Sequence, residues 1–384
     1  MPTEHSPDRR RLLGGMTAVA GSLAMAPVAM AMPAQPRGLA RAFRRAFRMG
    51  VAVSNHALDQ QDTAQLQLIE REFNSVTGEN AMKWGVIRPD GRNWQWQRAD
   101  RLVDFASRHR MALVGHTFVW HSQIPATVFA DDSGNALDRD ALLARMHEHI
   151  DTLAGRYRGK VWAWDVVNEA IDEDRGWRRS RWREIIGDDY MEQAFRFARA
   201  ADPKAQLLYN DYNMHNPGKR GFLVKVLRGY LDRGVPISGV GMQSHVGLAY
   251  PDLEEWERSI ATYTDMGLKV HITELDVDVL PQAAAAQADV ANRAGYAAEL
   301  DPWRQGLPEE MQQKLADRYE ALFRILLRYQ RSVERATFWG LHDGISWKND
   351  FPVRGRTNYP LLFDRSMQPK PAYARVMRLA GERR

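Results

Sequence analysis

The sequence predicts an α/β protein with one (β/α)8 TIM barrel domain, and three observations support this fold class. Short apolar runs alternate with amphipathic stretches from about residue 46 to the C-terminus. The apolar runs are nearly continuous, which is typical of parallel strands covered by helices. Eight such runs are present, and eight parallel strands close a barrel. Periodicity alone also allows a doubly wound open sheet, but no run is followed by the glycine-rich phosphate loop of its nucleotide-binding versions.

Each element is predicted from its own hydrophobic pattern. Short apolar runs predict strands at Met49–Val53, Phe73–Val76, Ala112–Phe118, Val161–Val167, Gln206–Tyr209, Val240–Gln243, Lys269–Thr273 and Ala336–Gly340. Apolar residues at helical spacing predict helices at Thr63–Glu72, Ala99–Arg108, Ala141–Tyr157, Tyr190–Ala201, Phe222–Leu231, Leu253–Met266, Glu309–Gln330 and Ala372–Leu379. The alanine run Ala283–Ala286, after Pro281, is expected in a long loop following the seventh strand.

The N-terminal segment is predicted to lie outside this fold. Arg9, Arg10 and Arg11 precede an alanine-rich apolar run with small residues at its end, which is the pattern of an export signal over residues 1–31. The consecutive arginines match a twin-arginine signal in part. A membrane anchor is the alternative, but Pro27 interrupts the apolar run. We expect an exported, periplasmic or secreted protein with a basic linker at 32–45 and a catalytic domain at 46–384.

Composition excludes several classes of protein. A hydrophobic fraction of 44% over 384 residues is too high for a disordered chain. The absence of cysteine excludes disulfides, thiolate metal sites, iron–sulfur clusters and a cysteine nucleophile. Fifty-three basic against 48 acidic residues leave a net charge of +5, too weak to indicate binding to nucleic acid or to an anionic membrane. The twelve tryptophans are not explained by composition alone.

Polar and aromatic residues gather just after the predicted strands, where a barrel places its chemistry. They are Glu79, Asn80, Lys83 and Trp84 after the second strand, His116, Trp120 and His121 after the third, Asn168 and Glu169 after the fourth, Asn210, Asp211, Tyr212 and Asn213 after the fifth, Gln243, Ser244 and His245 after the sixth, Glu274 and Asp276 after the seventh, and Trp339, His342, Asp343 and Trp347 after the eighth. We therefore expect one functional site at this end of the barrel.

Two carboxylates stand out in this set. Glu169 and Glu274 each directly follow a strand that is expected to be buried. Two converging carboxylates suit acid–base or nucleophilic work on an acetal. The alternative is that each glutamate only pairs with a nearby lysine or arginine, which is less persuasive for two glutamates on one rim of amide and indole groups.

Metal binding and serine hydrolysis are competing interpretations. His116 and His121 lie close in sequence, but sugar hydroxyls use the same hydrogen-bonding groups. His147 and His149 are two residues apart on a predicted helix and therefore face different sides. Ser122 and Ser244 lie near histidines, but neither stands in a nucleophile-elbow sequence. No metal or cofactor is expected.

Seven sequence stretches, in order along the chain, resemble glycoside hydrolase family 10 endo-1,4-β-xylanases. They are Glu79–Trp84, Gly115–His121, Trp164–Ala170, Asn210–Asn213, Gly241–His245, Ile272–Asp276 and Phe338–Gly340. The resemblance implies a retaining endo-hydrolase of xylan, with Glu169 as acid/base and Glu274 as nucleophile. A retaining pair stands roughly 5 Å apart, and strands of one barrel can hold that spacing.

The resemblance also implies roles for the residues around this pair. Asn168 would bind the sugar 2-hydroxyl, Gln243 would hold the site, and His245, oriented by Asp276, would bond Glu274. Substrate-binding residues would be Glu79, Asn80, Lys83, His116, Trp120, Tyr212, Trp339 and Trp347. Trp84 is expected in the sugar-stacking floor, whereas Trp162, Trp182 and Trp256 are expected to be core residues.

The expected partner is xylan or a xylo-oligosaccharide, bound by a monomer that, in its mature form, contacts neither nucleic acid nor membrane. Two alternatives stay open. One is a related β-glycanase that acts on β-1,4-glucan. The other is a catalytically silent xylan-binding protein, which the presence of both Glu169 and Glu274 disfavours.

Overall fold

The computed structural model describes residues 38–173, 176–282 and 293–382. The predicted export signal, residues 32–37 of the predicted linker and the alanine run Ala283–Ala286 lie outside these ranges. None of the described helices is long and apolar enough to cross a membrane. The architecture below is that of the unit Arg37–Arg384.

Eight parallel strands form a closed barrel, which confirms the predicted fold class. They are β1 (Arg48–Val53), β2 (Ser75–Gly78), β3 (Ala112–Trp120), β4 (Val161–Asn168), β7 (Gln206–Asp211), β8 (Gly239–Met242), β10 (Lys269–Asp278) and β11 (Val333–Phe338). Each strand pairs with the next, and β11 pairs with both β10 and β1, so the sheet closes on itself. This closure rules out the open-sheet alternative.

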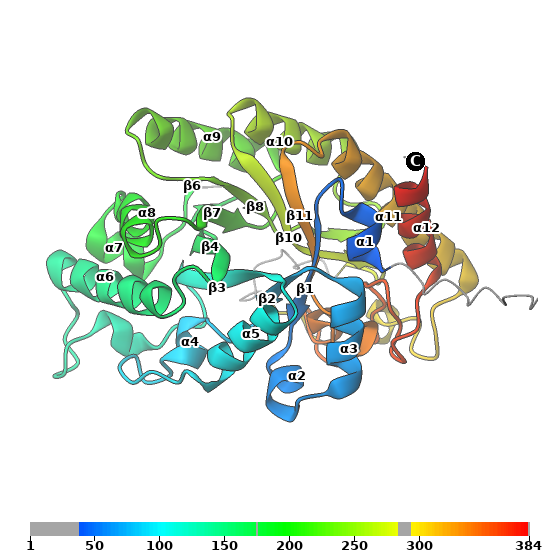
Figure 1. The fold of residues 1–384 in the computed structure, drawn as a ribbon, viewed down its shortest axis with the longest axis horizontal. Coiled ribbons are helices and arrows are strands. Elements are labelled where there is room, and N and C mark those ends of the chain that lie inside the picture. Colours follow the sequence, from blue (N-terminus) through cyan, green and yellow to red (C-terminus); the bar gives the residue numbers. More distant parts are fainter. Residues whose placement is uncertain (1–37, 174–175, 283–292, 383–384) are drawn as a thin grey trace, which may run out of the picture. The chain divides into compact units, whose positions relative to one another are not determined.

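Helices surround the strands (Figure 1). They are α1 (Leu39–Phe43), α2 (Asn55–Gln60), α3 (Thr63–Glu72), α4 (Trp84–Ile87), α5 (Gln97–Arg108), α6 (Arg139–Arg156), α7 (Arg181–Ile186), α8 (Tyr190–Ala201), α9 (Pro217–Asp232), α10 (Leu253–Asp265), α11 (Glu309–Arg328) and α12 (Pro371–Gly381). Side-chain caps define several starts: Asp138 accepts from the Ala141 amide, and Asn216 accepts from the amides of Gly218 and Lys219.

Helix α1 corrects the predicted domain boundary. Leu39 and Phe43 are fully buried, and the Phe43 ring lies 5.4 Å from those of Phe47 and Phe323. The Leu39 amide also donates to Glu72 over 3.1 Å. The segment from residue 38 to 45 is therefore part of the barrel unit and not a linker. Helix α1 has only five residues, of which two are buried, so the sequence shows no clear hydrophobic period there.

The bounds of the strands differ from the predicted ones by up to five residues. Strand β3 continues to Trp120, and β10 continues to Asp278, while β11 begins at Val333 and not at Ala336. The extension of β10 pairs with a short strand, β9 (His245–Gly247), with Asp276 opposite His245. Glu274 and Asp276 thus lie within a strand, whose backbone hydrogen bonds hold them. A short antiparallel hairpin, β5 (Ile171–Asp172) and β6 (Gly176–Trp177), follows β4.

Candidate active site

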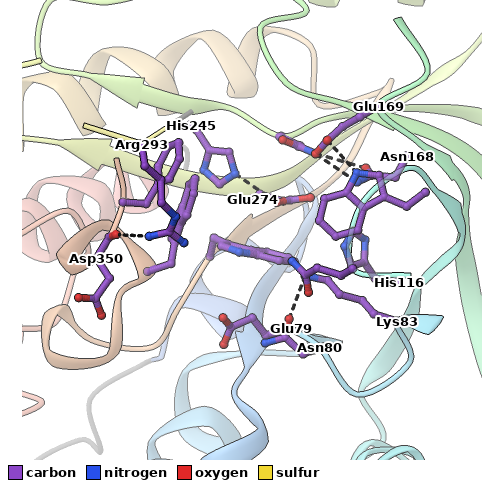
Figure 2. Close-up of a pocket in the computed structure, with 16 residues that line it drawn as sticks. Glu79, Asn80, Lys83, His116, Asn168, Glu169, His245, Glu274, Arg293 and Asp350 are labelled. Carbon is purple, nitrogen blue, oxygen red and sulfur yellow. Dashed lines mark hydrogen bonds and ion pairs between the residues drawn. The ribbon is translucent and has the colours of Figure 1, made fainter. Parts of the chain in front are cut away.

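A cavity of about 320 Å³ opens among residues at the carboxyl ends of the strands. It is lined by twelve predicted site residues, Glu79, Asn80, Lys83, His116, Trp120, Asn168, Glu169, Gln243, His245, Glu274, Trp339 and Trp347, and by Gln123, Arg293, Asp350 and Phe351. Figure 2 shows Glu169 and Asn168 on one side of this space, with Glu274 and His245 beside them. The carboxyl ends of parallel strands meet at one face, which explains why sequence-distant residues converge here.

Glu169 is buried and held by three hydrogen-bond donors. The Trp120 indole donates to Oε2 over 2.8 Å, while the Gln243 and Asn168 amides donate to Oε1 over 3.0 and 3.2 Å. Burial raises the pKa of Glu169, and the negative charge of Glu274 adds to this, whereas the bonds from Gln243 and Trp120 oppose it. Glu169 is therefore the better candidate for a proton donor.

Glu274 is equally buried but its electrostatic surroundings are opposite. The Asn210 amide donates to Oε1 over 2.8 Å, and Nε2 of His245 lies 3.1 Å from Oε2. Burial alone would raise the pKa of Glu274, but the bond from His245 and the charge of His116 outweigh it and lower that pKa. Glu274 is therefore the better candidate for a permanent carboxylate.

His245 carries the charge that keeps Glu274 ionised. Its Nδ1 lies 3.0 Å from Oδ2 of Asp276, which is fully buried. Burial would lower the pKa of His245, but the charges and hydrogen bonds of Asp276 and Glu274 outweigh it and raise that pKa to about 9. Asp276 also accepts the Trp347 indole N–H over 2.7 Å. It thus acts behind the cavity wall, because it does not line the cavity itself.

Buried amides join the two carboxylates. Asn210 donates to Oδ1 of Asn168 over 2.9 Å as well as to Glu274, and Gln243 approaches the same Asn168 oxygen at 3.3 Å. Thr273 donates to Oδ1 of Asn210 over 2.6 Å, which fixes the orientation of that amide. A Cβ at Gly241 would lie 2.4 Å from the same oxygen, so this strand position requires glycine. Asn210 was absent from the predicted support residues, although its place directly after the fifth predicted strand marked it.

His116 and its partner Asp165 form a second histidine–carboxylate pair. Nδ1 of His116 lies 2.9 Å from Oδ2 of Asp165, and both side chains are buried. The two residues are direct neighbours in the β3–β4 register. Nη2 of Arg335 lies 4.0 Å from the other Asp165 oxygen. This arrangement leaves Nε2 of His116 for the cavity.

Lys83, Asn80 and Glu79 form a polar corner of the cavity. Nζ of Lys83 donates to Oδ1 of Asn80 over 2.9 Å and lies 4.9 Å from the centre of the Trp120 ring. Burial lowers the pKa of Lys83 and raises that of Glu79, while the attraction between the two opposes both shifts. Such a corner offers both donors and acceptors to sugar hydroxyls.

Three indole rings form the apolar part of the wall. Trp339 lies 5.4 Å from the His116 ring in an edge contact, Trp347 lies 4.7 Å from the His245 ring, and Trp347 stacks on Phe351 at 4.7 Å. Trp120 and Trp339 are each 7% exposed, so the faces that remain open are those toward the cavity. Apolar faces of this kind suit the C–H groups of a pyranose ring.

Two predicted aromatic contacts do not reach this cavity. Tyr212 is 3% exposed, its hydroxyl accepts from Arg178 over 2.5 Å, and Nζ of Lys219 lies 4.0 Å from its ring centre. Trp84 is 3% exposed and stacks on His149 at 3.6 Å. The prediction that Trp84 belongs to a sugar-stacking floor is therefore wrong, because its ring faces are covered by the helix layer.

The three tryptophans that were predicted to be core residues lie away from the cavity. Trp182 and Trp256 are buried as predicted, and Trp162 is partly buried beneath Arg48.

Four cavity residues were not predicted from the sequence. Phe351, Asp350 and Arg293 come from long loops, and Arg293 donates to the Asp350 carbonyl over 3.2 Å (Figure 2). Gln123 follows the end of β3. None of the four directly follows a strand-like run, so only the folded chain shows them together.

Two of the histidines weighed as metal ligands, His147 and His149, make ring contacts away from the cavity. His147 stacks on Phe197 at 4.3 Å and His149 on Trp84, so the two face different neighbours, as their spacing predicts. Across residues 38–173, 176–282 and 293–382, no group of three or more histidine, aspartate or glutamate side chains is arranged to hold a metal ion.

Known proteins resemble this chain over nearly all of the barrel unit. Residues 38–379 match the family described as glycosyl hydrolase family 10. Endo-1,4-β-xylanase A of Xylanibacter ruminicola is 40% identical over 93% of this chain and 97% of its own length. A family 10 endoxylanase from a sugarcane soil metagenome has a TM-score of 0.87 at 48% identity, covering 89% of this chain and 100% of that one. A xylanase from Paenibacillus barcinonensis, complexed with a conduramine derivative, has a TM-score of 0.81 at 36% identity, covering 90% and 99%. With the paired glutamates and the closed barrel, these matches confirm the resemblance that the motifs predicted: the chain belongs to glycosyl hydrolase family 10.

Proposed function

We propose that the protein is an endo-1,4-β-xylanase that cleaves xylan by a retaining double displacement, with Glu169 as acid/base and Glu274 as nucleophile. The observation that carries this proposal is the opposite electrostatic environment of two carboxylates in one cavity. The pKa of Glu169 is raised by burial and by Glu274, whereas that of Glu274 is lowered by His245 and His116 against its burial. Pairs of this kind separate into an acid and an anion at neutral pH.

In the first step Glu274 attacks the anomeric carbon of the bound sugar. The bond from that carbon to the leaving oxygen breaks, and Glu169 donates its proton to this oxygen. The product is a glycosyl ester on Glu274 and a carboxylate on Glu169. His245 supports this step because its positive charge keeps Glu274 ionised and therefore nucleophilic.

In the second step the roles of Glu169 reverse. Esterification removes the negative charge of Glu274, so one of the causes that raise the pKa of Glu169 disappears. Glu169 can then accept a proton from water as the water oxygen attacks the anomeric carbon and the ester bond breaks. Two inversions at this carbon give net retention.

Asn168 fits a role at the sugar 2-hydroxyl. Its Oδ1 is held by Asn210 and Gln243, which fixes the amide plane and directs Nδ2 toward Glu169. The amide nitrogen has two N–H groups, so one can serve the sugar while the other serves Glu169. A hydrogen bond to the 2-hydroxyl strengthens as positive charge develops in the transition state.

Xylan is favoured over β-1,4-glucan for two reasons. Trp339 and Trp347 line the cavity beside His116 and His245, where their rings would crowd a hydroxymethyl group at C5 of a bound sugar. The relatives and solved structures described above are named as xylanases or endoxylanases. Lys83, Asn80, Glu79 and His116 then serve as the hydroxyl-binding groups on the non-reducing side of the scissile bond.

Product analysis on glucuronoxylan tests substrate and endo action together. We expect early release of mixed xylo-oligosaccharides, with little activity on soluble cellulose, and a β-configured anomer as the first product in a proton NMR time course. An α-anomer would contradict the retaining mechanism, and equal activity on cellulose would favour the glucanase alternative. If Glu274→Ala keeps activity on xylan, the assignment of the nucleophile is wrong. A chain that binds xylan without cleaving it would be the silent binding protein.

We also propose that residues 1–31 form an export signal and that the mature protein is a periplasmic or secreted monomer. The motif of three arginines before a short apolar run supports export. N-terminal sequencing of the protein from the periplasm and the medium, with light scattering of the purified form, tests this proposal. An uncleaved N-terminus in the cytoplasm would contradict it.

A further inference from the structure

The backbone of Glu169 adopts a conformation that a glutamate avoids on its own. Its φ is +57°, in the left-handed region, and it directly follows the end of β4. A non-glycine residue there costs about 1–3 kcal/mol and persists only where its surroundings impose it. This turn in the chain aims the Glu169 side chain into the cavity, so the groups that impose it also decide where the carboxyl lies.

Two sets of contacts hold this turn. Nε of Arg178 donates to the Glu169 carbonyl over 2.9 Å, and the Arg178 amide donates to the Ala170 carbonyl over 2.8 Å. The amides of Ala170 and Ile171 donate to the Tyr209 hydroxyl over 3.1 and 3.2 Å. Every one of these groups is buried. The backbone from Glu169 to Ile171 is thus held by Tyr209 of β7 and by Arg178, which directly follows β6.

A buried ion pair orients the Tyr209 hydroxyl. That hydroxyl donates to Oδ2 of Asp211, whose other oxygen accepts from Nζ of Lys219 over 2.7 Å. A hydroxyl has one donor and two acceptor positions, and here the donor is directed to Asp211 while both lone pairs face the two amides. Lys219 and Asp211 are fully buried, and Lys219 opposes the rise in the pKa of Asp211 that burial causes. Lys219 therefore favours the ionised form of Asp211, whose oxygens can only accept hydrogen bonds.

The two sets of contacts are also joined to each other. Nη2 of Arg178 donates to the Tyr212 hydroxyl over 2.5 Å, and the Tyr212 amide donates to Oδ1 of Asp211 over 2.9 Å. Tyr212 is therefore a link between Arg178 and Asp211, which accounts for its burial. None of these side chains lines the cavity.

We infer that Tyr209 and Arg178 are positioning residues for the acid/base, and that the Asp211–Lys219 pair sets the hydroxyl of Tyr209 so that Glu169 points at the leaving oxygen. This inference rests on the proposed function. It assigns Tyr209 and Arg178 to proton donation and not to sugar binding, because Arg178 bonds the Glu169 carbonyl, Tyr209 bonds the two amides that follow Glu169, and neither side chain lines the cavity. A shift of the carboxyl by about 1 Å is enough to cost 100-fold in rate.

The dependence on the leaving group tests the inference. We would measure kcat/KM, which reports the first step alone, on xylotetraose and on a dinitrophenyl β-xylobioside, whose leaving group needs no proton. For Tyr209→Phe we expect about a 10- to 100-fold loss on xylotetraose and less than about a threefold loss on the activated substrate. Arg178→Lys, which keeps the charge but cannot bond two acceptors in the same geometry, should give the same pattern.

Tyr263→Phe is the matched control. Tyr263 is also fully buried, and within the described residues its hydroxyl has no hydrogen-bond partner. It should keep both activities, and thermal unfolding would show whether any variant is partly unfolded. The inference would be overturned if Tyr209→Phe or Arg178→Lys lost kcat/KM equally on both substrates. It would also be overturned if one of these variants lost no activity on xylotetraose. If the wild-type protein fails to cleave either substrate, or if Glu169→Ala loses both activities equally, the proposed function fails and not only this inference.

Discussion

The indole nitrogen of Trp120 lies 2.8 Å from Oε2 of Glu169, so a residue of the cavity wall is also a hydrogen-bond donor to one of the two central carboxylates. The same indole ring faces the ammonium group of Lys83 at 4.9 Å. Trp120 therefore connects the polar corner of the cavity with the proposed acid/base. Its substitution should change the protonation of Glu169 as well as the shape of the wall.

Trp120→Phe should move the basic limb of the pH–activity profile to higher pH. The indole bond lowers the pKa of Glu169, so its loss raises that pKa. Glu169 must be protonated in the first step, and activity falls as pH rises through this pKa. A bond of about 1 kcal/mol corresponds to a shift of about 0.7 units. The measurement is kcat/KM on xylotetraose between pH 4 and 10. The control is Trp94→Phe, because the Trp94 ring stacks on Trp96 and does not line the cavity. A downward shift would contradict the donor role.

His245→Asn should move the acidic limb in the same direction for a different reason. His245 lowers the pKa of Glu274 through its hydrogen bond and its charge, so its removal raises that pKa. Glu274 must be ionised to attack, and activity falls as pH drops below its pKa. We expect the acidic limb of kcat/KM to rise by at least about one unit, with a lower plateau. If the basic limb moved and the acidic limb did not, His245 would be acting on Glu169.

Lys219→Met should destabilise the protein strongly. Lys219 and Asp211 are fully buried and joined over 2.7 Å, so removing the ammonium group leaves a carboxylate without its counter-ion. Loss of one partner of a buried pair costs about 3–5 kcal/mol. Urea unfolding followed by tryptophan fluorescence measures this. Lys225→Met on the exposed face of the same helix should change stability by less than about 0.5 kcal/mol, and an equal effect of both would show that the pair contributes nothing.

Phe43→Ala tests whether α1 belongs to the folded unit. Phe43 is 1% exposed and contacts the rings of Phe47 and Phe323, so its truncation leaves a cavity. We expect a loss of about 3–5 kcal/mol in the free energy of unfolding. Arg45→Ala, at an exposed position after the same helix, is the control and should be nearly neutral. If Phe43→Ala were neutral as well, residues 38–45 would be the linker that the sequence suggested.

Local patterns were sufficient to predict the barrel and most of its site. Near-continuous apolar runs such as Val161–Val167 and helical periodicity such as that of Glu309–Gln330 identified eight strand–helix repeats, since a parallel strand is buried on both faces. Because all parallel strands deliver their carboxyl ends to one face, residues directly after these runs could be assigned to one site. Twelve of those predicted residues line the cavity.

Predictions were wrong or incomplete where a side chain's environment comes from distant segments. Trp84 and Trp120 both follow strand-like runs, but a neighbouring helix covers Trp84 through His149, whereas Trp120 faces the cavity. Arg293 and Phe351 are in loops whose course no local pattern defines. Helix α1 is too short to show a clear periodicity, and only its contacts with Phe47 and Phe323 reveal it as part of the core.

The sequence by itself thus determined the fold class, the family and the residue types that meet at the strand ends, because hydrophobic period and strand-end position are local properties. Only the tertiary structure decided how the two glutamates differ. Glu169 and Glu274 are chemically identical, and each follows a buried run. The pKa of Glu274 is lowered by His245, which Asp276 holds, and by His116. The pKa of Glu169 is raised by burial and by the charge of Glu274, and the bonds from Gln243 and Trp120 only partly oppose this rise. These are contacts between strands far apart in sequence. The left-handed turn at Glu169 is likewise imposed from outside, by Arg178 and Tyr209.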